Sequence, residues 1–290
     1  MKNIAQEKMD EIVQKVIESI ENNETGTWSQ GWLENGLPQN YKTQTPYSGF
    51  NTLTLMFMAE EMGYSSNQWL TFNQIKFIKG AHLKKGSKST PVFFFKMLDK
   101  TEEINGKKEK TTIPLLKFYY VYNTDQVEGI EIGTEKPQNE DLNTFVANTQ
   151  VEVKTRMNAY YSPKSDYIGM PDLKLFKSSE DHAATLLHEL AHSTGHETRL
   201  NREMGGEFAS EEYSKEECIA ELTSMFLMSH LGIKGQTKNS EAYIKGWLIK
   251  GLKAEPKLLW KIASESQKAF NYLLEQQQEQ EIAAWQIYKK

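Results

Sequence analysis

The sequence predicts an α+β fold in two domains that are joined by a polar connector. Apolar residues recur at helical spacing near the N-terminus and through most of the second half of the chain. The runs 92–95 and 118–122 are instead short, continuous apolar and aromatic segments, which is typical of buried strands. Between the two halves, residues 131–148 are polar. We therefore expect one domain over residues 1–135, a linker over 136–148 and a second domain over 149–290.

Composition and charge exclude several classes of protein. Of the 290 residues 38% are apolar, which is enough for a substantial core, and the formal net charge of -5 argues against uniform wrapping of nucleic acid but not against local basic patches. The single cysteine, Cys218, excludes an internal disulfide framework and suits a reducing compartment. Residues 1–10 are charged throughout, unlike a secretory signal, and no apolar run reaches the roughly 20 residues that span a bilayer. We expect a soluble, cytoplasmic protein with no membrane partner.

The first half begins with two predicted helices separated by a polar loop. Apolar residues at helical spacing predict a helix over residues 4–22, and a turn near Pro46 leads into a second apolar helix over 53–62. The loop between them contains Trp28 and Trp32. Such indole rings either fill the core or present flat faces to a ligand, and the sequence slightly favours the core.

A lysine-rich tract follows these helices. Residues 76–96 contain six lysines and no acidic residue. The strand 92–95 is expected to pair with 118–122 in a long hairpin whose tip is Asn105-Gly106. Lysines bind phosphates without base selectivity and aromatic faces stack on unpaired bases, so single-stranded nucleic acid suits this mixture best as a ligand. A solvated charged loop beside an ordinary aromatic core explains the composition equally well.

The second half contains short strands followed by helices. Alternation over 151–154 predicts a strand, and 160–163 with 167–171 predicts a hairpin. Ser178 is expected to cap the next helix, which ends near Gly195. Further helices are predicted over 214–231 and over 243–274, the latter broken at Pro256.

The run His188-Glu189-Leu190-Ala191-His192 is where the sequence specifies a chemistry. It has the form H-E-x-x-H in a stretch without Gly or Pro. Four residues make about one helical turn, so both imidazoles project from one face and can reach the same metal ion. Glu189 is placed to take a proton from water bound to that metal. The alternative is a surface or core histidine pair, but the apolar neighbours predict burial, and unpaired burial of these groups is unfavourable. The motif therefore predicts a metal site, with zinc the expected ion and manganese the alternative.

A catalytic zinc site needs a third protein ligand and one open position. His196 follows Gly195, which ends the helix, so we expect it to support the site, with metal binding by His196 as the alternative. The helix predicted from Ser214 contains Glu217 and Glu221 one turn apart. We favour Glu217 as the ligand and Glu221 as the residue that orients a histidine. If Ser214 and Glu217 instead form a capping box, Glu221 becomes the ligand.

The whole chain resembles the ArdC-type antirestriction proteins of mobile elements. The matching stretches in the first half include Pro46-Tyr47-Ser48-Gly49-Phe50-Asn51, Trp69-Leu70-Thr71-Phe72 and Lys84-Lys85-Gly86-Ser87-Lys88. Those in the second half include Thr185-Leu186-Leu187-His188-Glu189-Leu190-Ala191-His192, Arg199-Leu200-Asn201-Arg202 and Glu216-Glu217-Cys218-Ile219-Ala220-Glu221. The resemblance implies an N-terminal domain that binds single-stranded DNA and a C-terminal zincin-like metallopeptidase domain.

The resemblance also favours the nucleic-acid interpretation of the first half. The residues expected to contact DNA are Lys84, Lys85, Lys88, Trp28, Trp32 and Trp69. The main hypothesis is an antirestriction protein with a zinc-dependent peptidase centre, whose protein substrate the sequence does not specify. The alternatives are a DNA-binding antirestriction protein with a structural or vestigial metal, and a nuclease that acts on the bound strand.

Overall fold

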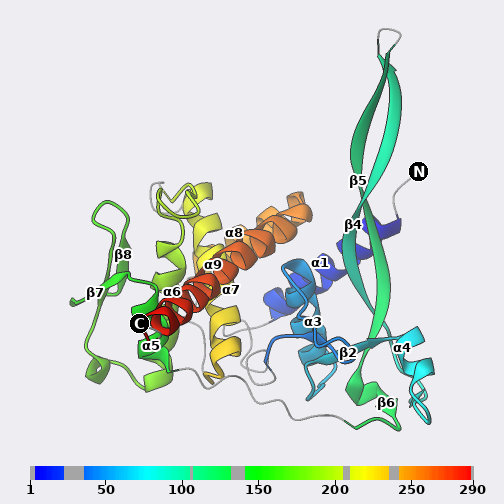
Figure 1. Ribbon diagram of the computed structural model, residues 1–290, viewed down its shortest axis with the longest axis horizontal. Helices are drawn as coiled ribbons and strands as arrows, with labels where there is room; N and C mark the ends of the chain where they lie inside the picture. The colour runs from blue at the N-terminus through cyan, green and yellow to red at the C-terminus, as the bar shows by residue number, and fades with distance from the viewer. Residues whose placement is uncertain are drawn as a thin grey trace.

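The structure is a computed structural model that describes residues 4–22, 36–104, 107–131, 141–204, 210–234 and 242–288. The predictions for Trp28, Trp32 and the hairpin tip Asn105-Gly106 fall outside the described residues. The fold mixes helices with small sheets, as predicted (Figure 1). None of the described helices is long and apolar enough to cross a lipid bilayer.

The first half contains a four-stranded sheet, a two-stranded sheet and three helices among the described residues. The larger sheet has the order β1-β2-β5-β4, with β1 parallel to β2 and the other pairs antiparallel. Its strands are β1 (Gln39–Asn40), β2 (Gln68–Thr71), β4 (Thr90–Ile104) and β5 (Lys107–Asn123). The smaller sheet pairs β3 (His82–Leu83) with β6 (Val127–Glu128). The helices are α1 (Ile4–Asn22), α3 (Phe50–Glu61) and α4 (Phe72–Phe77), and a 3-10 turn, η1, spans Thr124–Gln126.

The second half contains a three-stranded sheet and five helices among the described residues. The strands of the sheet are β7 (Glu152–Thr155), β8 (Tyr160–Ser162) and β9 (Tyr167–Met170), and their order is β7-β9-β8. The central strand β9 is parallel to β7 and antiparallel to β8. The helices are α5 (Leu142–Asn148), α6 (Ser179–Ser193), α7 (Glu211–Leu231), α8 (Ala242–Ala254) and α9 (Lys257–Tyr288), and a 3-10 turn, η2, spans Leu173–Leu175.

Most of the predicted elements are confirmed. The helix expected over 4–22 is α1, and the helix expected over 53–62 is α3, which begins three residues earlier at Phe50. The strands 92–95 and 118–122 lie in β4 and β5 and pair with each other, with Phe93 opposite Phe118. Helix α5 lies inside the stretch predicted as a linker. Its N-cap, Asp141, accepts a hydrogen bond from Thr144 N, and its Phe145 is fully buried, which the polar composition did not reveal.

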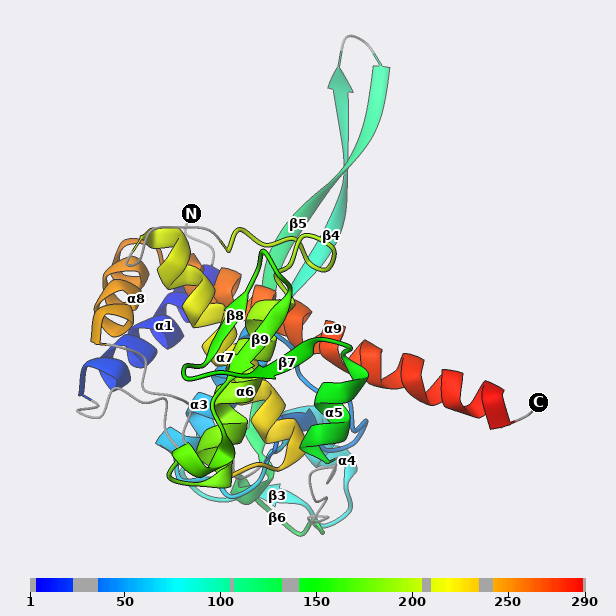
Figure 2. The ribbon, with the colours of Figure 1, turned by 90° about the vertical axis from the view of Figure 1, so that its left-hand side faces the viewer.

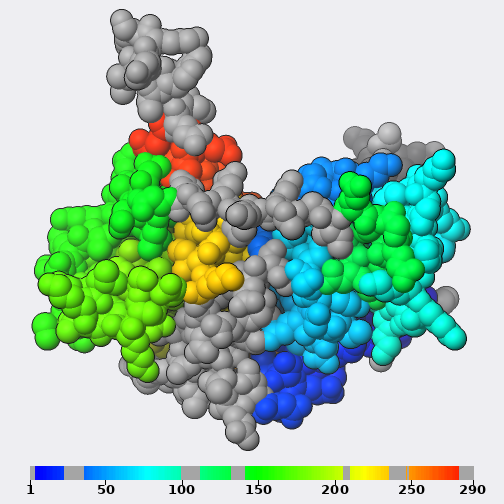
Figure 3. Space-filling view, turned by 90° about the horizontal axis from the view of Figure 1, so that it is seen from below, coloured from blue at the N-terminus to red at the C-terminus, as the bar shows by residue number. Residues whose placement is uncertain are grey.

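The two halves share one hydrophobic core. Helix α1 packs against α8, and α3 packs against α9. Trp260 of α9 stacks on Phe50 of α3 with ring centroids 5.0 Å apart, and it also meets Phe93 and Phe95 of β4. Seen from below, the halves are two masses side by side, with residues near the end of α7 visible between them (Figure 3). Helix α9 is therefore part of the core of both halves.

The β4–β5 hairpin forms a long arm that stands away from the rest of the molecule (Figures 1 and 2). Its pairing runs from Thr90 opposite Val121 to Ile104 opposite Lys107. Apolar side chains along it are exposed: Met97 is 57% accessible and Ile113 is 43% accessible. At these positions the arm therefore contributes little burial to the core.

Shortening the arm should consequently leave the fold intact. Replacing residues 99–112 with an Asn-Gly turn joins the facing residues Leu98 and Ile113, both of which have a backbone N–H, through a compatible hairpin loop. We expect the melting temperature to change by less than roughly 4 °C, as measured by circular dichroism. Loss of the folded signal would show that the arm packs more closely than its exposure indicates.

Candidate metal centre

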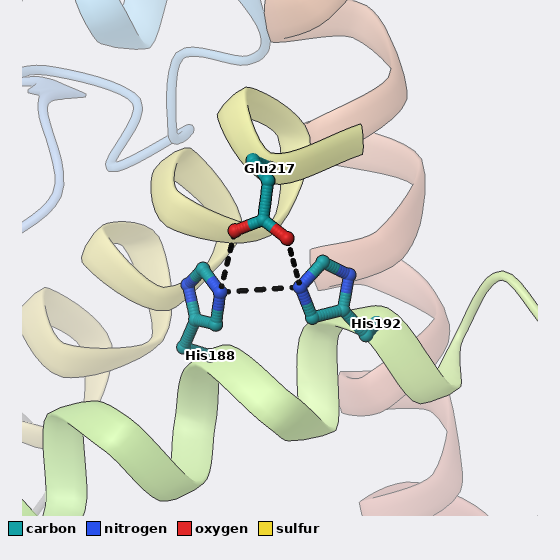
Figure 4. A group of neighbouring side chains, drawn as sticks. All are labelled: His188, His192 and Glu217. Atoms are coloured by element: carbon teal, nitrogen blue, oxygen red, sulfur yellow. Dashed lines mark hydrogen bonds and ion pairs between the residues drawn. The ribbon is translucent and has the colours of Figure 1, made fainter. Parts of the chain in front are cut away.

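Helix α6 brings two imidazoles together. Ser178 caps the helix by accepting a hydrogen bond from Asp181 N, as predicted, and the helix ends at Ser193. Because His188 and His192 are one turn apart, both rings lie on the face turned toward α7 (Figure 4). Their Nε2 atoms are 3.1 Å apart, with the ring planes inclined at 85°. Both side chains are largely buried.

Helix α7 begins one turn earlier than predicted. Its N-cap is Ser210, whose hydroxyl accepts a hydrogen bond from Tyr213 N. Ser214 lies inside the helix, fully buried, and its hydroxyl donates to Ser210 O. The alternative in which Ser214 and Glu217 form a capping box is therefore wrong. Glu217 stands in the second turn, where it has no capping role, and its carboxylate faces the histidines instead (Figure 4).

Glu217 completes a three-sided group with His188 and His192. Its Oε2 lies 3.3 Å from His188 Nε2, and its Oε1 lies 3.5 Å from His192 Nε2. One ligand atom from each residue fits within 4.8 Å of the others. In a tetrahedral zinc site with bonds near 2.0–2.1 Å, neighbouring ligand atoms are about 3.3 Å apart. The two Nε2 atoms, 3.1 Å apart and each within 3.5 Å of a Glu217 oxygen, are therefore close enough together for the three residues to bind one small divalent cation.

Two more carboxylates contact the outer nitrogens of the imidazoles. Glu216 Oε1 lies 3.2 Å from His192 Nδ1, within hydrogen-bonding distance. Glu221 Oε2 lies 3.3 Å from His188 Nδ1, but in an orientation that does not form a hydrogen bond, so this is the looser of the two contacts. Carboxylates in these positions fix the ring orientation and the tautomer of metal-binding histidines. Both rings thus direct Nε2 toward the shared position.

The carboxylates also decide how protons are held in the metal-free centre. Burial opposes a charged imidazole, but Glu217 and Glu221 outweigh it and raise the pKa of His188, and Glu216 and Glu217 do the same for His192. Burial would raise the pKa of Glu217, but the two histidines lower it well below its ordinary value. At neutral pH the metal-free centre therefore holds a proton where the metal would bind.

Metal binding should displace that proton. At pH 7 we expect Zn²⁺ to release roughly one to two protons per ion, and the apparent affinity to rise with pH until the imidazole pair is deprotonated. The sign follows from the raised pKa values of His188 and His192, which keep the site protonated at pH 7. Isothermal titration calorimetry in buffers of different ionisation enthalpy measures the proton count. An affinity independent of pH between 6 and 9 would contradict this assignment.

The other predicted site residues occupy different positions. Glu189 is buried, 6% accessible, and directly follows His188 in α6. His196 lies beyond the end of α6, where its Nδ1 contacts the hydroxyl of Thr198 at 2.8 Å, outside the group formed by the histidine pair and Glu217.

In the first half, all three predicted lysines are exposed, and the Lys84 ammonium donates to Asp125 O. The prediction that Trp69 contacts DNA is wrong. The Trp69 side chain is completely buried in β2, with its ring edge against Tyr64, and cannot stack on a base. Lys85 and Lys88 remain available to a ligand.

Sequence reasoning did not assign a role to Glu216 or Arg202. The Arg202 guanidinium forms a two-pronged hydrogen bond to Glu216 at 2.6 and 2.9 Å. Burial would raise the pKa of Glu216, but Arg202 and His192 together hold it below its ordinary value. The sequence feature that could have indicated a role for Glu216 was its position directly before the candidate ligand Glu217.

The fold and the site define a class of protein. An H-E-x-x-H helix packed against a small sheet, with a glutamate from the next helix, is the arrangement of a zincin. A family model described as zincin-like metallopeptidase matches residues 140–265, and one described as the N-terminal domain of anti-restriction factor ArdC matches residues 6–122. The crystal structure of the metal-free antirestriction ArdC protein from plasmid R388 superposes with a TM-score of 0.76 at 33% identity, covering 92% of this chain and 97% of that one. The chain belongs to the ArdC antirestriction family.

Further relatives fit this family. The Mn(II)-bound structure of the R388 protein has a TM-score of 0.74 at 32% identity, and the match covers 95% of this chain and 98% of that one. Two DNA primases TraC of Escherichia coli are 31% and 32% identical over 93% of this chain. The chain spans only 27% and 20% of the length of those primases.

Proposed function

We propose that this antirestriction protein is a metal-dependent peptidase. His188, His192 and Glu217 hold the ion, which we expect to be zinc, with manganese as the alternative because a relative was solved with Mn(II). The observation that carries the proposal is that the two Nε2 atoms lie 3.1 Å apart and each lies within 3.5 Å of a Glu217 oxygen, so three protein residues can bind one ion and leave a coordination position open. Bound there, the ion would lower the pKa of a water molecule and polarise a peptide carbonyl.

Glu189 is the proposed general base. It follows His188 directly, so its carboxylate leaves the same helix beside the metal ligands without sharing their direction. It would take a proton from the attacking water and pass it to the leaving amine. Glu216 and Glu221 already contact the imidazoles, which leaves Glu189 for this role.

The test compares two polymers. Zinc-loaded protein is incubated with labelled casein and, separately, with labelled single-stranded DNA, and the lengths of both are followed. Shortening of casein alone supports the peptidase. Shortening of DNA alone would indicate a nuclease, and no shortening of either would favour a structural or vestigial metal.

A second function is supported by a different surface. We propose that the first half binds single-stranded DNA through Lys84, Lys85 and Lys88 together with exposed aromatic rings of α4. Phe77 is 82% accessible and Phe72 is 46% accessible, and the Lys76 ammonium lies 4.5 Å from the centre of the Phe72 ring. Exposed rings between lysines are suited to stacking on unpaired bases while the ammonium groups contact phosphates. In the cytoplasm of a cell that receives DNA as a single strand, both functions would be available to one antirestriction protein.

Replacing Phe77 with alanine should weaken this binding. A base–aromatic stack contributes about 1–3 kcal/mol, so we expect roughly 5- to 150-fold weaker binding of a labelled oligonucleotide by fluorescence anisotropy. The matched control is Phe94→Ala, because Phe94 is also an exposed aromatic but lies on the arm, outside α4. Equal affinity of both variants and the wild-type protein would exclude α4 as the stacking surface.

A further inference from the structure

Arg202 ties the end of the metal-binding helix to the next helix. Besides the two hydrogen bonds to Glu216 on α7, its guanidinium donates to Thr194 Oγ1 at 2.6 Å and to Ala191 O at 3.0 Å, both at the end of α6. The ion pair is almost fully enclosed, since the two side chains are 6% and 7% accessible. An arginine buried with this many bonds holds its partner in one geometry.

The local backbone is shaped to admit this guanidinium. Arg202 N donates to Gly195 O, which folds the chain back onto the end of α6. Asn201, immediately before it, has a φ of 48°, a left-handed conformation that turns the chain at this point. A Cβ at Gly195 would overlap Met204 Sδ and come within 3.1 Å of Arg202 Nη2. The absence of a side chain at Gly195 therefore makes room for the Arg202 contact.

The carboxylate that Arg202 holds also contacts a metal-binding residue. Glu216 Oε1 accepts from Arg202 Nη2 and lies 3.2 Å from His192 Nδ1. Glu221, the corresponding partner of His188, has no such cation, and its Oε1 has no hydrogen-bond partner among the described residues. The carboxylate beside His192 is therefore held more rigidly than the carboxylate beside His188.

We propose that Arg202 is a positioning residue of the metal centre, which acts through Glu216 to hold His192 with its Nε2 directed at the metal. The inference rests on the metal site of the proposed function, but not on turnover. Without Arg202, Glu216 would be a buried carboxylate without its cation, and it would move or take up a proton instead of holding the imidazole. The ring of His192 would then lose its fixed direction.

The test is the metal affinity of Arg202→Met, measured by competition with a chromophoric chelator. We expect about 10- to 100-fold weaker Zn²⁺ binding, the effect of losing the outer partner of a ligand. The matched control is Arg199→Met. Arg199 also bonds the end of α6, through Ser193 O, but its other partner is Asp166, which contacts no metal-binding residue. We expect Arg199→Met to retain wild-type affinity even if it melts at a lower temperature.

Two further variants separate positioning from general stability. Because Arg202 acts through Glu216, the double variant R202M/E216A should bind no more weakly than Glu216→Ala alone, and Arg202→Lys should recover part of the loss. The visible absorption of the Co²⁺-loaded protein should change in Arg202→Met and not in Arg199→Met. If Arg202→Met does not fold, Glu216→Gln gives the same readout with the shape of the side chain retained.

The outcomes distinguish this inference from the proposed function. Wild-type affinity in folded Arg202→Met or Glu216→Gln, or equal losses in Arg202→Met and Arg199→Met, would overturn the positioning role alone. A protein that binds zinc with the predicted pattern of variants but cleaves no casein would support the positioning role and reject only the peptidase. A wild-type protein that binds no metal would overturn both.

Discussion

Replacing Glu189 with glutamine is expected to slow casein cleavage by about 10²- to 10⁴-fold while one equivalent of metal remains bound. Glutamine has nearly the same shape as glutamate but cannot accept a proton from water. The metal ligands His188, His192 and Glu217 are unchanged, so the site should still fill. Cleavage is followed with fluorescent casein, and bound zinc by elemental analysis of the same sample.

A second glutamate on the same helix provides the control. Glu180 lies exposed in the first turn of α6, about two turns from the metal ligands, so Glu180→Gln should cleave casein at the wild-type rate. A wild-type rate in Glu189→Gln would remove Glu189 from the mechanism. If protection against restriction also survives in Glu189→Gln, peptidase activity would not be what serves antirestriction.

Removing the Glu217 carboxylate should have the largest effect on metal binding. Glu217→Ala deletes the ligand that contacts both Nε2 atoms, so we expect the affinity for Zn²⁺ to fall by more than about 100-fold, beyond the range for an outer partner. The increase in melting temperature on adding zinc should become smaller as well, because stabilisation of the folded state by a ligand depends on the ligand concentration relative to its dissociation constant. Elemental analysis after gel filtration measures occupancy directly.

The matched control variant is Glu221→Gln. Glu221 lies one turn further along α7 than Glu217, and it contacts only the outer nitrogen of His188. We expect this variant to retain most of the bound metal. The reverse result, with metal lost in Glu221→Gln and kept in Glu217→Ala, would restore the alternative in which Glu221 is the ligand.

The histidine pair could be predicted from sequence because it depends on helical spacing alone. The third ligand depends on where α7 begins, and two serines one turn apart, Ser210 and Ser214, both suit an N-cap by residue type. Only the tertiary structure decides between them, because it buries Ser214 inside the helix. Once the cap is Ser210, the competing role of Glu217 disappears.

The aromatic residues show a similar limit. Trp69 and Phe72 are aromatic residues only three positions apart in the sequence, yet Trp69 is fully buried and Phe72 is 46% accessible. Strand β2 ends and α4 begins between them, at the capping residue Thr71. Composition suggested a stacking surface but could not show which ring was exposed.

The pairing of β7 with β9 was also beyond local patterns. Alternation predicted the strand over 151–154, and 167–171 was predicted as part of a hairpin with 160–163. The parallel register of β7 and β9, with Val153 beside Ile168, connects segments that β8 separates in the sequence. Such long-range pairing is set by the whole fold rather than by either strand.

Helix α9 makes the protein hard to dissect. In the first half, Trp260 stacks on Phe50, and the Gln267 side chain accepts a hydrogen bond from Gly49 N. In the second half, the Ser266 hydroxyl donates a hydrogen bond to Ile219 O, two residues from Glu217. A fragment truncated near residue 135 would lack the tryptophan that covers Phe50 and would expose an aromatic socket to water. The two TraC primases match 93% of this chain, so both halves occur together in those proteins as well.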